Sequence, residues 1–474
     1  MPGQVSAASR HSSFVVVANR LPVDRVNHAD GSITWRTSPG GLVTALKPVM
    51  RENDGAWIGW PGSPDEKLEP FDEKGMALIP VTLSAQEVEE YYEGFSNGTL
   101  WPLYHDVIVA PEFHREWWDA YVEVNARFAE LTADVADKGA TAWIHDYQLQ
   151  LVPAMLRQLR PDIKIGFFLH IPFPPTELFL QVPWRRQLLE GLLGADLIGF
   201  QRPGAAANFV RLVRHKLGYK THRDRIYLPG GRTARAASYP ISIDADGLEA
   251  LARKPETIAR AEEIRAGVGR PARVLLGVDR LDYTKGIRQR LRAFGELLRD
   301  GQCDVDEAVF IQVATPSRER VEQYRVLRNE IDRLVGRING EQGRIGRPAI
   351  QYLHSSFPRS EMAALFTAAD VMVVTPLRDG MNLVAKEYVS CRYDNKGALV
   401  LSEFAGAADE LKQAFTVNPY DINGLKETLL TAMRADERDL GRRMRAMRRY
   451  IREHDVNRWA RGFLADLRKE PPPE

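Results

Sequence analysis

Short runs of apolar and β-branched residues alternate along the chain with longer stretches in which apolar residues recur every three or four positions. The short runs predict strands buried on both faces, and the longer stretches predict amphipathic helices. A regular alternation of such strands and helices is typical of α/β proteins with parallel sheets. The sequence therefore predicts an α/β fold built on parallel sheets.

The expected elements form two series, separated by a Pro-containing segment at 239–244. In the first series we expect strands at 14–18, 141–144, 165–169 and 197–200 and helices at 149–159 and 187–193. In the second we expect strands at 274–278, 308–313, 350–353, 371–375 and 398–401 and a helix at 318–335. We infer a flexible tail (1–12), an N-terminal domain (13–240), a C-terminal domain (241–454) and a final amphipathic helix (455–470) that packs back on the N-terminal domain.

Composition supports this interpretation and excludes several classes of function. The 474 residues are 44% hydrophobic and 27% charged, which is ordinary for a globular protein of two domains. A net charge of +1 provides no global field that would attract nucleic acid or an anionic membrane. The basic stretch 442–452 carries Met444, Met447 and Ile451 at helical spacing, which indicates a solvated helix with one buried face.

Neither a disulfide framework nor a zinc site is expected, because the two cysteines, Cys303 and Cys391, are far apart and lack metal-ligand spacing. The N-terminus does not have the pattern of a signal peptide, and no apolar run is long enough to span a bilayer. We expect a soluble, cytoplasmic protein.

The segment that points most directly to chemistry is 277–286, with the sequence GVDRLDYTKG. It follows a buried strand, so its polar groups lie at the carboxyl end of that strand, where open α/β sheets bind ligands. Arg280 and Lys285 are five residues apart across a turn and can converge on one diphosphate. The alternative is a solvated turn in which these cations pair with Asp279 and Asp282.

A second segment, 375–388, has the sequence TPLRDGMNLVAKEY. Here a strand ends, a Gly-containing loop turns, and a helix is expected to start near Asn382. The first amides of a helix lack intrahelical partners and form an anion site. Glu387, one turn further along, can accept hydrogen bonds from ribose hydroxyls, whereas Asp379 could be only the helix cap.

Further candidates lie in the N-terminal series. Gly40 and Gly41 allow a backbone to approach a ligand closely, although a plain turn is the alternative, and a G-x-G-x-x-G fingerprint for a nicotinamide cofactor is lacking. Asp146 and His170 each follow a strand and should lie at the same sheet edge, where they suit sugar hydroxyls or proton handling. A structural histidine is the alternative.

Aromatic and acidic pairs are weaker candidates. Tyr92 and Trp101 could form an aromatic platform for a ligand, or they could belong to the core. Two Asp-x-Asp triplets, at 244–246 and 304–306, resemble metal-binding pairs, but neither ends a strand beside the expected phosphate site. We therefore expect no metal, with cationic side chains and a helix terminus neutralising the diphosphate instead.

Together these segments closely resemble the trehalose-6-phosphate synthases, a family of retaining glycosyltransferases with two facing Rossmann-like domains (GT-B). The likeness runs from about residue 14 to 467 and is most specific in 145–148, 169–174, 279–286 and 377–388. It implies transfer of glucose from a nucleotide-diphosphate-glucose to glucose 6-phosphate, giving α,α-trehalose 6-phosphate with retention and without a metal or other cofactor. Family members vary at 63–75 and 230–236, which we interpret as surface loops.

The resemblance also assigns residues to the two substrates, an acceptor in the N-terminal domain and a nucleotide sugar in the C-terminal domain. The donor side comprises Gly40, Gly41, His170, Arg280, Lys285, Phe357, Asp379, Gly380, Met381, Asn382, Leu383 and Glu387. The acceptor side comprises Arg20, Tyr92, Trp101, Asp146 and Arg318, with Arg20 and Arg318 on the phosphate. Catalysis would rest on Asp146, His170, Arg280 and Lys285, the last two stabilising the departing diphosphate.

Three alternatives stay open: a catalytically inactive sugar-phosphate sensor, a pseudo-glycosyltransferase acting on cyclitols, and an NAD-dependent oxidoreductase. The donor-site charges oppose the sensor, the motifs at 279–286 and 382–387 oppose the pseudo-glycosyltransferase, and the missing glycine fingerprint opposes the oxidoreductase. The sequence leaves open whether the donor carries uridine, adenosine or guanosine, and whether the chain forms a homo-oligomer. We expect a separate trehalose-phosphate phosphatase to act on the product, and no nucleic-acid or membrane partner.

Overall fold

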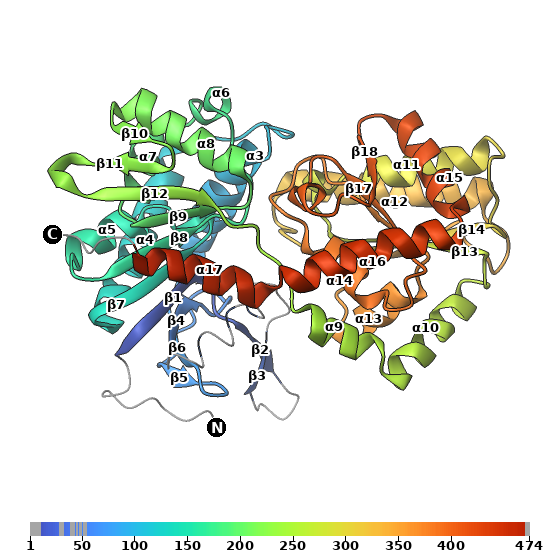
Figure 1. The fold of residues 1–474 in the computed structure, drawn as a ribbon, viewed down its shortest axis with the longest axis horizontal. Coiled ribbons are helices and arrows are strands. Elements are labelled where there is room, and N and C mark those ends of the chain that lie inside the picture. The colour runs from blue at the N-terminus through green and yellow to red at the C-terminus, as the bar shows by residue number, and fades with distance from the viewer. Residues whose placement is uncertain are drawn as a thin grey trace. The chain divides into compact units, whose positions relative to one another are not determined.

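The computed structural model describes residues 11–27, 33–37, 43, 46, 50 and 55–469. The chain divides into two compact units (Figure 1). Unit 1 combines Met1–Ile241 with Asn457–Glu474, and unit 2 is Ser242–Val456. Gly40 and Gly41, expected at the donor site, lie outside the described residues. Within the part of the chain that is described, no helix has the length and apolar character needed to cross a membrane.

The described residues of unit 1 form a ten-stranded sheet in the order β10-β11-β12-β9-β8-β7-β1-β4-β6-β5 and a two-stranded sheet of β2 and β3. The strands from β12 to β6 in this order are parallel, and the antiparallel strands β10, β11 and β5 lie at the edges. The chain builds β4 and β6 on one side of β1 and then β7, β8 and β9 on the other. The strand order therefore reverses between β1 and β7, which is the topological switch point where open α/β sheets bind ligands.

The elements of unit 1 have the following bounds. Its strands are β1 (Ser12–Arg20), β2 (Val23–Asn27), β3 (Ile33–Thr37), β4 (Ala56–Trp60), β5 (Phe71–Asp72), β6 (Ala77–Pro80), β7 (Ala136–His145), β8 (Lys164–Phe168), β9 (Leu197–Phe200), β10 (Lys220–His222), β11 (Arg225–Tyr227) and β12 (Thr233–Ser238). Its helices are α2 (Ala85–Glu87), the π-helical η2 (Val88–Leu100), α3 (Trp101–Tyr104), α4 (Arg115–Val135), η3 (Tyr147–Leu149), α5 (Val152–Leu159), α6 (Thr176–Phe179), α7 (Arg185–Leu192), α8 (Pro203–Leu212), η4 (Val213–Leu217), η5 (Pro229–Gly231) and α17 (Val456–Lys469).

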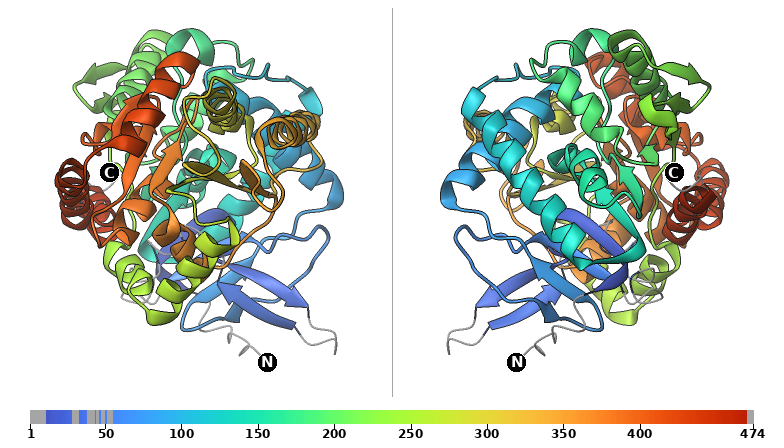
Figure 2. Two further views of the ribbon diagram at one scale, coloured as in Figure 1. Left: turned by 90° about the vertical axis from the view of Figure 1, so that its right-hand side faces the viewer. Right: turned by 90° about the vertical axis from the view of Figure 1, so that its left-hand side faces the viewer.

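The described residues of unit 2 form a six-stranded, wholly parallel sheet in the order β15-β14-β13-β16-β17-β18. Numbered along the chain this order is 3-2-1-4-5-6, the arrangement of dinucleotide-binding folds, and its switch point lies between β13 and β16. Helices cover both faces of the sheet (Figure 2). The prediction of an α/β fold with parallel, Rossmann-like sheets is confirmed.

The elements of unit 2 have the following bounds. Its strands are β13 (Arg273–Arg280), β14 (Ala308–Thr315), β15 (Ile350–Leu353), β16 (Val371–Val374), β17 (Ala398–Ser402) and β18 (Phe415–Val417). Its helices are α9 (Ala245–Ala252), α10 (Pro255–Gly267), η6 (Tyr283–Lys285), α11 (Ile287–Arg299), α12 (Glu322–Gln342), α13 (Arg359–Ala368), α14 (Leu383–Cys391), η7 (Gly406–Asp409), α15 (Ile422–Arg434) and α16 (Glu437–Glu453).

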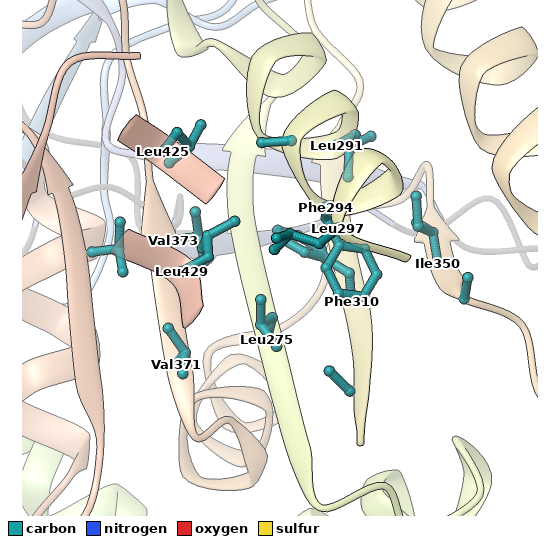
Figure 3. Close-up of a cluster of buried hydrophobic side chains, with 14 of the residues drawn as sticks. Leu275, Leu291, Phe294, Leu297, Phe310, Ile350, Val371, Val373, Leu425 and Leu429 are labelled. Carbon is teal, nitrogen blue, oxygen red and sulfur yellow. The ribbon is translucent and has the colours of Figure 1, made fainter. Parts of the chain in front are cut away.

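The core of unit 2 fixes β13 in the centre of its sheet. Leu291 and Phe294 of α11 are fully buried and belong to one apolar cluster with Leu275 of β13 and Phe310 of β14 (Figure 3). Burial of this apolar area is the main force that seats α11 on the sheet. Because α11 begins directly after the turn that follows β13, the same packing fixes that turn.

The last helix, α17, packs on the sheet of unit 1. Phe463 is fully buried, and its ring stacks on Trp143 of β7 with centroids 4.7 Å apart. Gly166 of β8 and Gly199 of β9 admit this ring, since a Cβ at either position would lie 2.8 Å from a Phe463 ring carbon. Helix α17 is thus held by the Phe463 ring, which packs over two glycines of the sheet.

Two expectations about local structure are wrong. The helix expected at 318–335 begins only at Glu322, because Arg318 has a φ of 50°, which a right-handed helix excludes. The stretch 230–236, expected as a surface loop, contains most of strand β12, which pairs with β9 and buries Ala234 and Ala236. Short alanine side chains gave β12 no strong strand pattern. The basic stretch 442–452 does lie in a helix, α16, that buries Met444, Met447 and Ile451, as predicted.

Candidate active site

The turn after β13 and the turn after β16 are joined at the switch point of unit 2. The amide of Leu377 donates to the carbonyl oxygen of Thr284 at 2.7 Å. Gly286, which has a φ of 62°, starts α11 so close to β16 that a Cβ there would lie 1.9 Å from the carbonyl oxygen of Thr375. Only glycine fits both the backbone angle and the space at this position.

Lys285 and Asp379 bring the two predicted segments into direct contact. The Lys285 Nζ lies 2.6 Å from the Asp379 Oδ2, and the Asn382 Nδ2 donates to the same oxygen at 3.2 Å. Asn382 also caps α14, since its Oδ1 accepts from the amide of Ala385 at 3.2 Å. Asp379 is therefore not the cap of this helix, and that alternative is wrong. A cation, a carboxylate and a helix N-terminus thus meet at one place.

Arg280 and Arg318 share one buried carboxylate. The Oδ2 of Asp282 lies 3.8 Å from the Arg280 Nη2 and 3.5 Å from the Arg318 Nη1, and it accepts from the Tyr324 hydroxyl at 3.2 Å. The backbone amide and hydroxyl of Thr284 both donate to Oδ1. Burial by itself would raise the pKa of Asp282, but the charges of Arg318 and Arg280 outweigh it and lower the pKa to about 2. Asp282 is therefore ionised at neutral pH.

The segment 277–286 is largely buried and not a solvated turn, although one ion pair of that alternative, Arg280 with Asp282, is present at 3.8 Å. Asp282 and Thr284 are fully buried, and Lys285 is 9% exposed. Arg280 differs from its neighbours, because 43% of its side chain is exposed. Arg280 can therefore reach a ligand while its guanidinium stays beside Asp282.

Arg290 of α11 is part of the site and was not singled out in the sequence. Its fully buried guanidinium pairs with Asp279 and donates to Gln312 at 2.9 Å, to the Thr375 hydroxyl at 3.2 Å and to the Lys285 carbonyl at 3.3 Å. It links the ends of three adjacent strands to η6. The signal that could have found it is its position three residues after Ile287, on the apolar face of an amphipathic helix.

Other donor-side candidates lie around the same sheet edge. Glu387 lies in α14 and is partly buried; burial raises its pKa, and the charge of Arg359 opposes this rise. Phe357, also partly buried, lies between β15 and α13. The backbone of Met381 accepts from the amide of Ala407 at 2.8 Å, which fixes the loop that also contains Gly380 and leads to Leu383.

At the switch point of unit 1, Arg20 and Tyr92 gather around Trp60. The Arg20 guanidinium carbon lies 5.2 Å from the centre of the Trp60 ring, and the Tyr92 ring meets Trp60 edge-on at 5.7 Å. The preceding residue, Asn19, accepts a hydrogen bond from the Tyr91 hydroxyl at 2.8 Å. Segment η2 is therefore tied to the end of β1.

Asp146 and His170 meet at the same edge of the sheet, as the sequence predicts for residues that follow neighbouring parallel strands. The backbone amide of His170 donates to the Asp146 Oδ1 at 3.2 Å. Asp146 has a φ of 75°, a strained conformation for a residue with a Cβ and one that is common at active sites. Trp101 is 4% exposed, with its ring 5.7 Å from that of Tyr147, so its position fits the core alternative.

The acceptor-side residues are divided between the units. Arg20, Tyr92, Trp101 and Asp146 belong to unit 1, whereas Arg318 belongs to unit 2. That these residues form a single acceptor pocket stays a prediction. The structure brings together Arg280 with Arg318, Lys285 with Asp379 and Asn382, and Asp146 with His170.

The two Asp-x-Asp triplets have structural contacts. Asp244 caps α9 by accepting from the amide of Gly247 at 2.9 Å. Asp304 accepts from the amides of Asp306 and Glu307, and Asp306 pairs with Arg344 at 2.6 Å. Among the described residues, no group of three or more His, Cys, Asp or Glu side chains could hold a metal ion. Cys303 and Cys391 are free and buried.

Two Rossmann-like units, each with charged side chains at its switch point, define a protein of the GT-B class. Within that class the chain belongs to glycosyltransferase family 20, whose family model matches residues 12–469. It is 58% identical over 482 residues to a trehalose-6-phosphate synthase of Mycolicibacterium vanbaalenii, covering 99% of this chain and 98% of that one.

Solved structures agree with this membership. A Burkholderia xenovorans alpha,alpha-trehalose-phosphate synthase (UDP-forming), in complex with glucose-6-phosphate, has a TM-score of 0.88 and 35% identity over 96% of this chain and 99% of that one. An E. coli structure bound with UDP-2-fluoro glucose has a TM-score of 0.86 and 33% identity over 97% of this chain and 100% of that one. The predicted family is confirmed.

Proposed function

We propose that the chain transfers glucose from a nucleotide-diphosphate-glucose to glucose 6-phosphate, giving α,α-trehalose 6-phosphate and a nucleoside diphosphate with retention at the donor carbon. The observation that carries the proposal is the meeting of Lys285, exposed Arg280 and the N-terminus of α14 at one switch point, within a family 20 chain. Relatives bound to glucose-6-phosphate and to UDP-2-fluoro glucose support the two substrate classes.

On the donor side, we assign stabilisation of the departing diphosphate to Arg280, Lys285 and the first amides of α14. Preorganised donors aimed at developing negative charge account for a large share of many rate enhancements. Asp379 holds the Lys285 ammonium at 2.6 Å, so a partner within the chain orients the cation. Asn382 fixes the helix terminus, and Glu387 is assigned to the ribose and Phe357 to the base.

On the acceptor side, we assign the phosphate of glucose 6-phosphate to Arg20 and Arg318, and its sugar to Tyr92, Trp101 and Asp146. Asp146 orients the attacking hydroxyl, whose proton passes to the departing phosphate oxygen. This route gives retention without the two closely spaced carboxylates that retaining glycosidases use. Cationic side chains neutralise the leaving group, so the proposal includes neither metal nor other cofactor.

The proposal extends to the setting of the reaction. Both substrates are phosphorylated and cross membranes poorly, so we place the reaction in the cytoplasm. The product is a sugar phosphate, and a phosphatase must act on it wherever the free disaccharide is needed.

The direct test is an assay of the purified protein with glucose 6-phosphate and UDP-, ADP- or GDP-glucose in turn. We expect release of the nucleoside diphosphate together with a product whose NMR spectrum shows a 1,1 linkage between two α-anomers. Binding of both substrates without release of nucleoside diphosphate would instead identify the inactive sensor. Activity that survives EDTA in metal-free buffer is expected, and its loss would contradict the cofactor-free mechanism.

A second test removes one donor to the diphosphate. Arg280→Ala should lower kcat about 100-fold or more, because one charge-stabilising donor contributes on that order. The matched control is Arg288→Ala, which removes an exposed arginine of the same unit that pairs with Glu330 at 3.1 Å. Near-normal turnover by a folded Arg280→Ala protein would overturn the assignment.

A further inference from the structure

His145 and His170 touch through their ring nitrogens at the carboxyl ends of neighbouring strands of unit 1. His145 is the last residue of β7, and His170 follows the end of β8 by two residues. The Nδ1 of His145 lies 3.2 Å from the Nε2 of His170. A hydrogen bond between two neutral imidazoles requires that one of these nitrogens carries a proton and that the other is bare.

Two arrangements of the protons satisfy this requirement. In the first, Nδ1–H of His145 donates to Nε2 of His170, so the single proton of neutral His170 must be on its Nδ1. In the second, Nε2–H of His170 donates to Nδ1 of His145, so the single proton of His145 must be on its Nε2. The Nδ1 of His170 is therefore a hydrogen-bond donor in the first arrangement and an acceptor in the second.

The surroundings of His145 distinguish the two arrangements. Its side chain is fully buried, and its Nε2 has no hydrogen-bond partner among the described residues. The second arrangement would therefore bury an N–H group with nothing to accept it, a defect that folded proteins rarely contain. The first arrangement leaves only a lone pair without a partner at this nitrogen.

Protonation of the pair does not offer a third arrangement near neutral pH. Burial lowers the pKa of His145 well below 6.5, and the nearby His170 lowers it further. Burial also lowers the pKa of His170, to about 3. Both rings are neutral, so the position of one proton on each ring defines the pair completely.

We propose that His145 is a positioning residue that holds His170 in the tautomer with its proton on Nδ1. The backbone of His170 is fixed as well, since its amide donates to Asp146 at 3.2 Å and its carbonyl accepts from Gln201 at 3.4 Å. The hydrogen bonds of His170 to described residues use its Nε2, its amide and its carbonyl and leave out Nδ1, and its side chain is partly exposed, so we assign the N–H at Nδ1 to a ligand. Resting on the proposed function, this gives His170 the role of a neutral donor to a hydroxyl oxygen of the transferred glucose.

The test measures the tautomer directly by NMR of protein labelled with ¹⁵N in its histidine rings. The ring nitrogen shifts distinguish a protonated from a bare nitrogen, and the His170→Asn spectrum identifies the signals of His170 by their loss. In the unsubstituted protein we expect a protonated Nδ1 and a bare Nε2. A proton on Nε2 of His170 would overturn the proposal, whether or not the protein has the proposed enzymatic activity.

Two substitutions of His145 separate the hydrogen bond from the packing. His145→Asn keeps an N–H near the position of Nδ1 and should keep the tautomer of His170, whereas His145→Phe keeps a ring but removes the donor and should lower the Nδ1–H population. His454→Phe, which changes a histidine of unit 2 bonded to the Tyr450 carbonyl, is the control and should leave the signals of His170 unchanged. An unchanged tautomer in His145→Phe would overturn the proposal.

Kinetics provide a second readout. His145→Phe should lower kcat about tenfold, because an incorrectly held group costs rate even when it is still present, and His145→Asn should restore most of this loss. An equal loss in both variants would show a packing role for His145 and would overturn the positioning role.

Discussion

Several charged residues at the switch point of unit 2 are fully buried, and each has a partner of opposite charge. Asp282 faces Arg280 and Arg318, and Asp279 pairs with Arg290. Such pairs contribute little net stability compared with apolar residues of similar size, but removing one partner leaves an uncompensated buried charge. We infer that these pairs fix the geometry of the two turns at the switch point of unit 2.

The Asp279–Arg290 pair allows this to be measured. Arg290→Met should lower the free energy of unfolding of unit 2 by about 3–5 kcal/mol, since it leaves the buried carboxylate of Asp279 without its arginine partner. The double variant Asp279→Asn with Arg290→Met should regain part of that loss in urea denaturation, because the stranded charge is gone. If the double variant is less stable than Arg290→Met alone, the charge pair is not the cause.

The buried histidines of unit 1 predict a dependence of stability on pH. Their folded-state pKa values lie below 6.5, so below that pH the unfolded chain binds protons that the folded chain does not, and stability falls as pH falls. Each histidine contributes about 1.4 kcal/mol per pH unit in the window between its folded pKa and 6.5. His145→Phe should therefore flatten the decline of the thermal midpoint between pH 6.5 and pH 5. A decline as steep as in the unsubstituted protein would contradict this.

At the scale of elements, two short turns determine where the donor-side groups lie. Each contains a residue in the left-handed region, Gly286 with a φ of 62° before α11 and Asn382 with a φ of 80° before α14. The first turn positions Lys285 and the second positions the N-terminus of α14. Because these turns meet β16 and each other, a change in one displaces both.

Gly286→Ala tests this coupling, and Gly301 supplies the matched control. Both glycines have positive φ, but a Cβ at 286 would lie 1.9 Å from the Thr375 carbonyl oxygen, whereas a Cβ at 301 meets nothing within 4 Å. Gly301→Ala should cost about 1–2 kcal/mol of backbone strain alone and keep activity. Gly286→Ala should be less stable than this and should lose most of its turnover. Equal thermal midpoints and activities for the two variants would show that the close approach of Gly286 to Thr375 matters neither for stability nor for activity.

The sequence predicts most strands and both donor-side turns, because their signals are local. An apolar run such as 274–278 can bury both faces only as a central strand, and the polar residues after it must then lie at the sheet edge. The start of α14 near Asn382 was predicted for the same kind of reason, from a loop followed by a helical pattern.

The rest depends on contacts between distant segments, which one sequence does not report. Arg290 bonds to Asp279 of β13, to Gln312 of β14 and to Thr375, which directly follows β16, and only the folded sheet places these together. Arg318 lies outside the helix expected for it, and its side chain reaches Asp282, 36 positions away. The pairing of His145 with His170 likewise follows from strand register. The roles assigned to the individual site residues stay predictions.

At the scale of the whole molecule, unit 1 is built from two separate parts of the chain. The segment 457–474 belongs with 1–241, and the whole of unit 2 lies between them in sequence. The segment 457–474 is attached to the rest of unit 1 by the packing of Phe463 on Trp143, with Gly166 and Gly199 beneath the Phe463 ring. The stability of unit 1 therefore depends on residues far from its other parts along the chain.

Phe463→Ala should destabilise unit 1 by about 3–5 kcal/mol, the usual cost of removing a buried aromatic ring. Hydrogen exchange should show faster opening of β7, β8 and β9 and unchanged protection in unit 2. Arg461→Ala, on the exposed side of the same helix, is the control and should change neither. Faster exchange in both units to the same extent would show that the two units unfold together.

The split of unit 1 also determines the order in which the protein can be completed on the ribosome. At about 5–20 residues per second, the segment 242–456 takes roughly 10–40 seconds to synthesise. Throughout that time Trp143, Gly166 and Gly199 have been synthesised, but Phe463 of α17, which packs on them, has not. Unit 2, although second in the sequence, is therefore the first to have all its residues, and unit 1 is completed only when the segment 457–474 has been made.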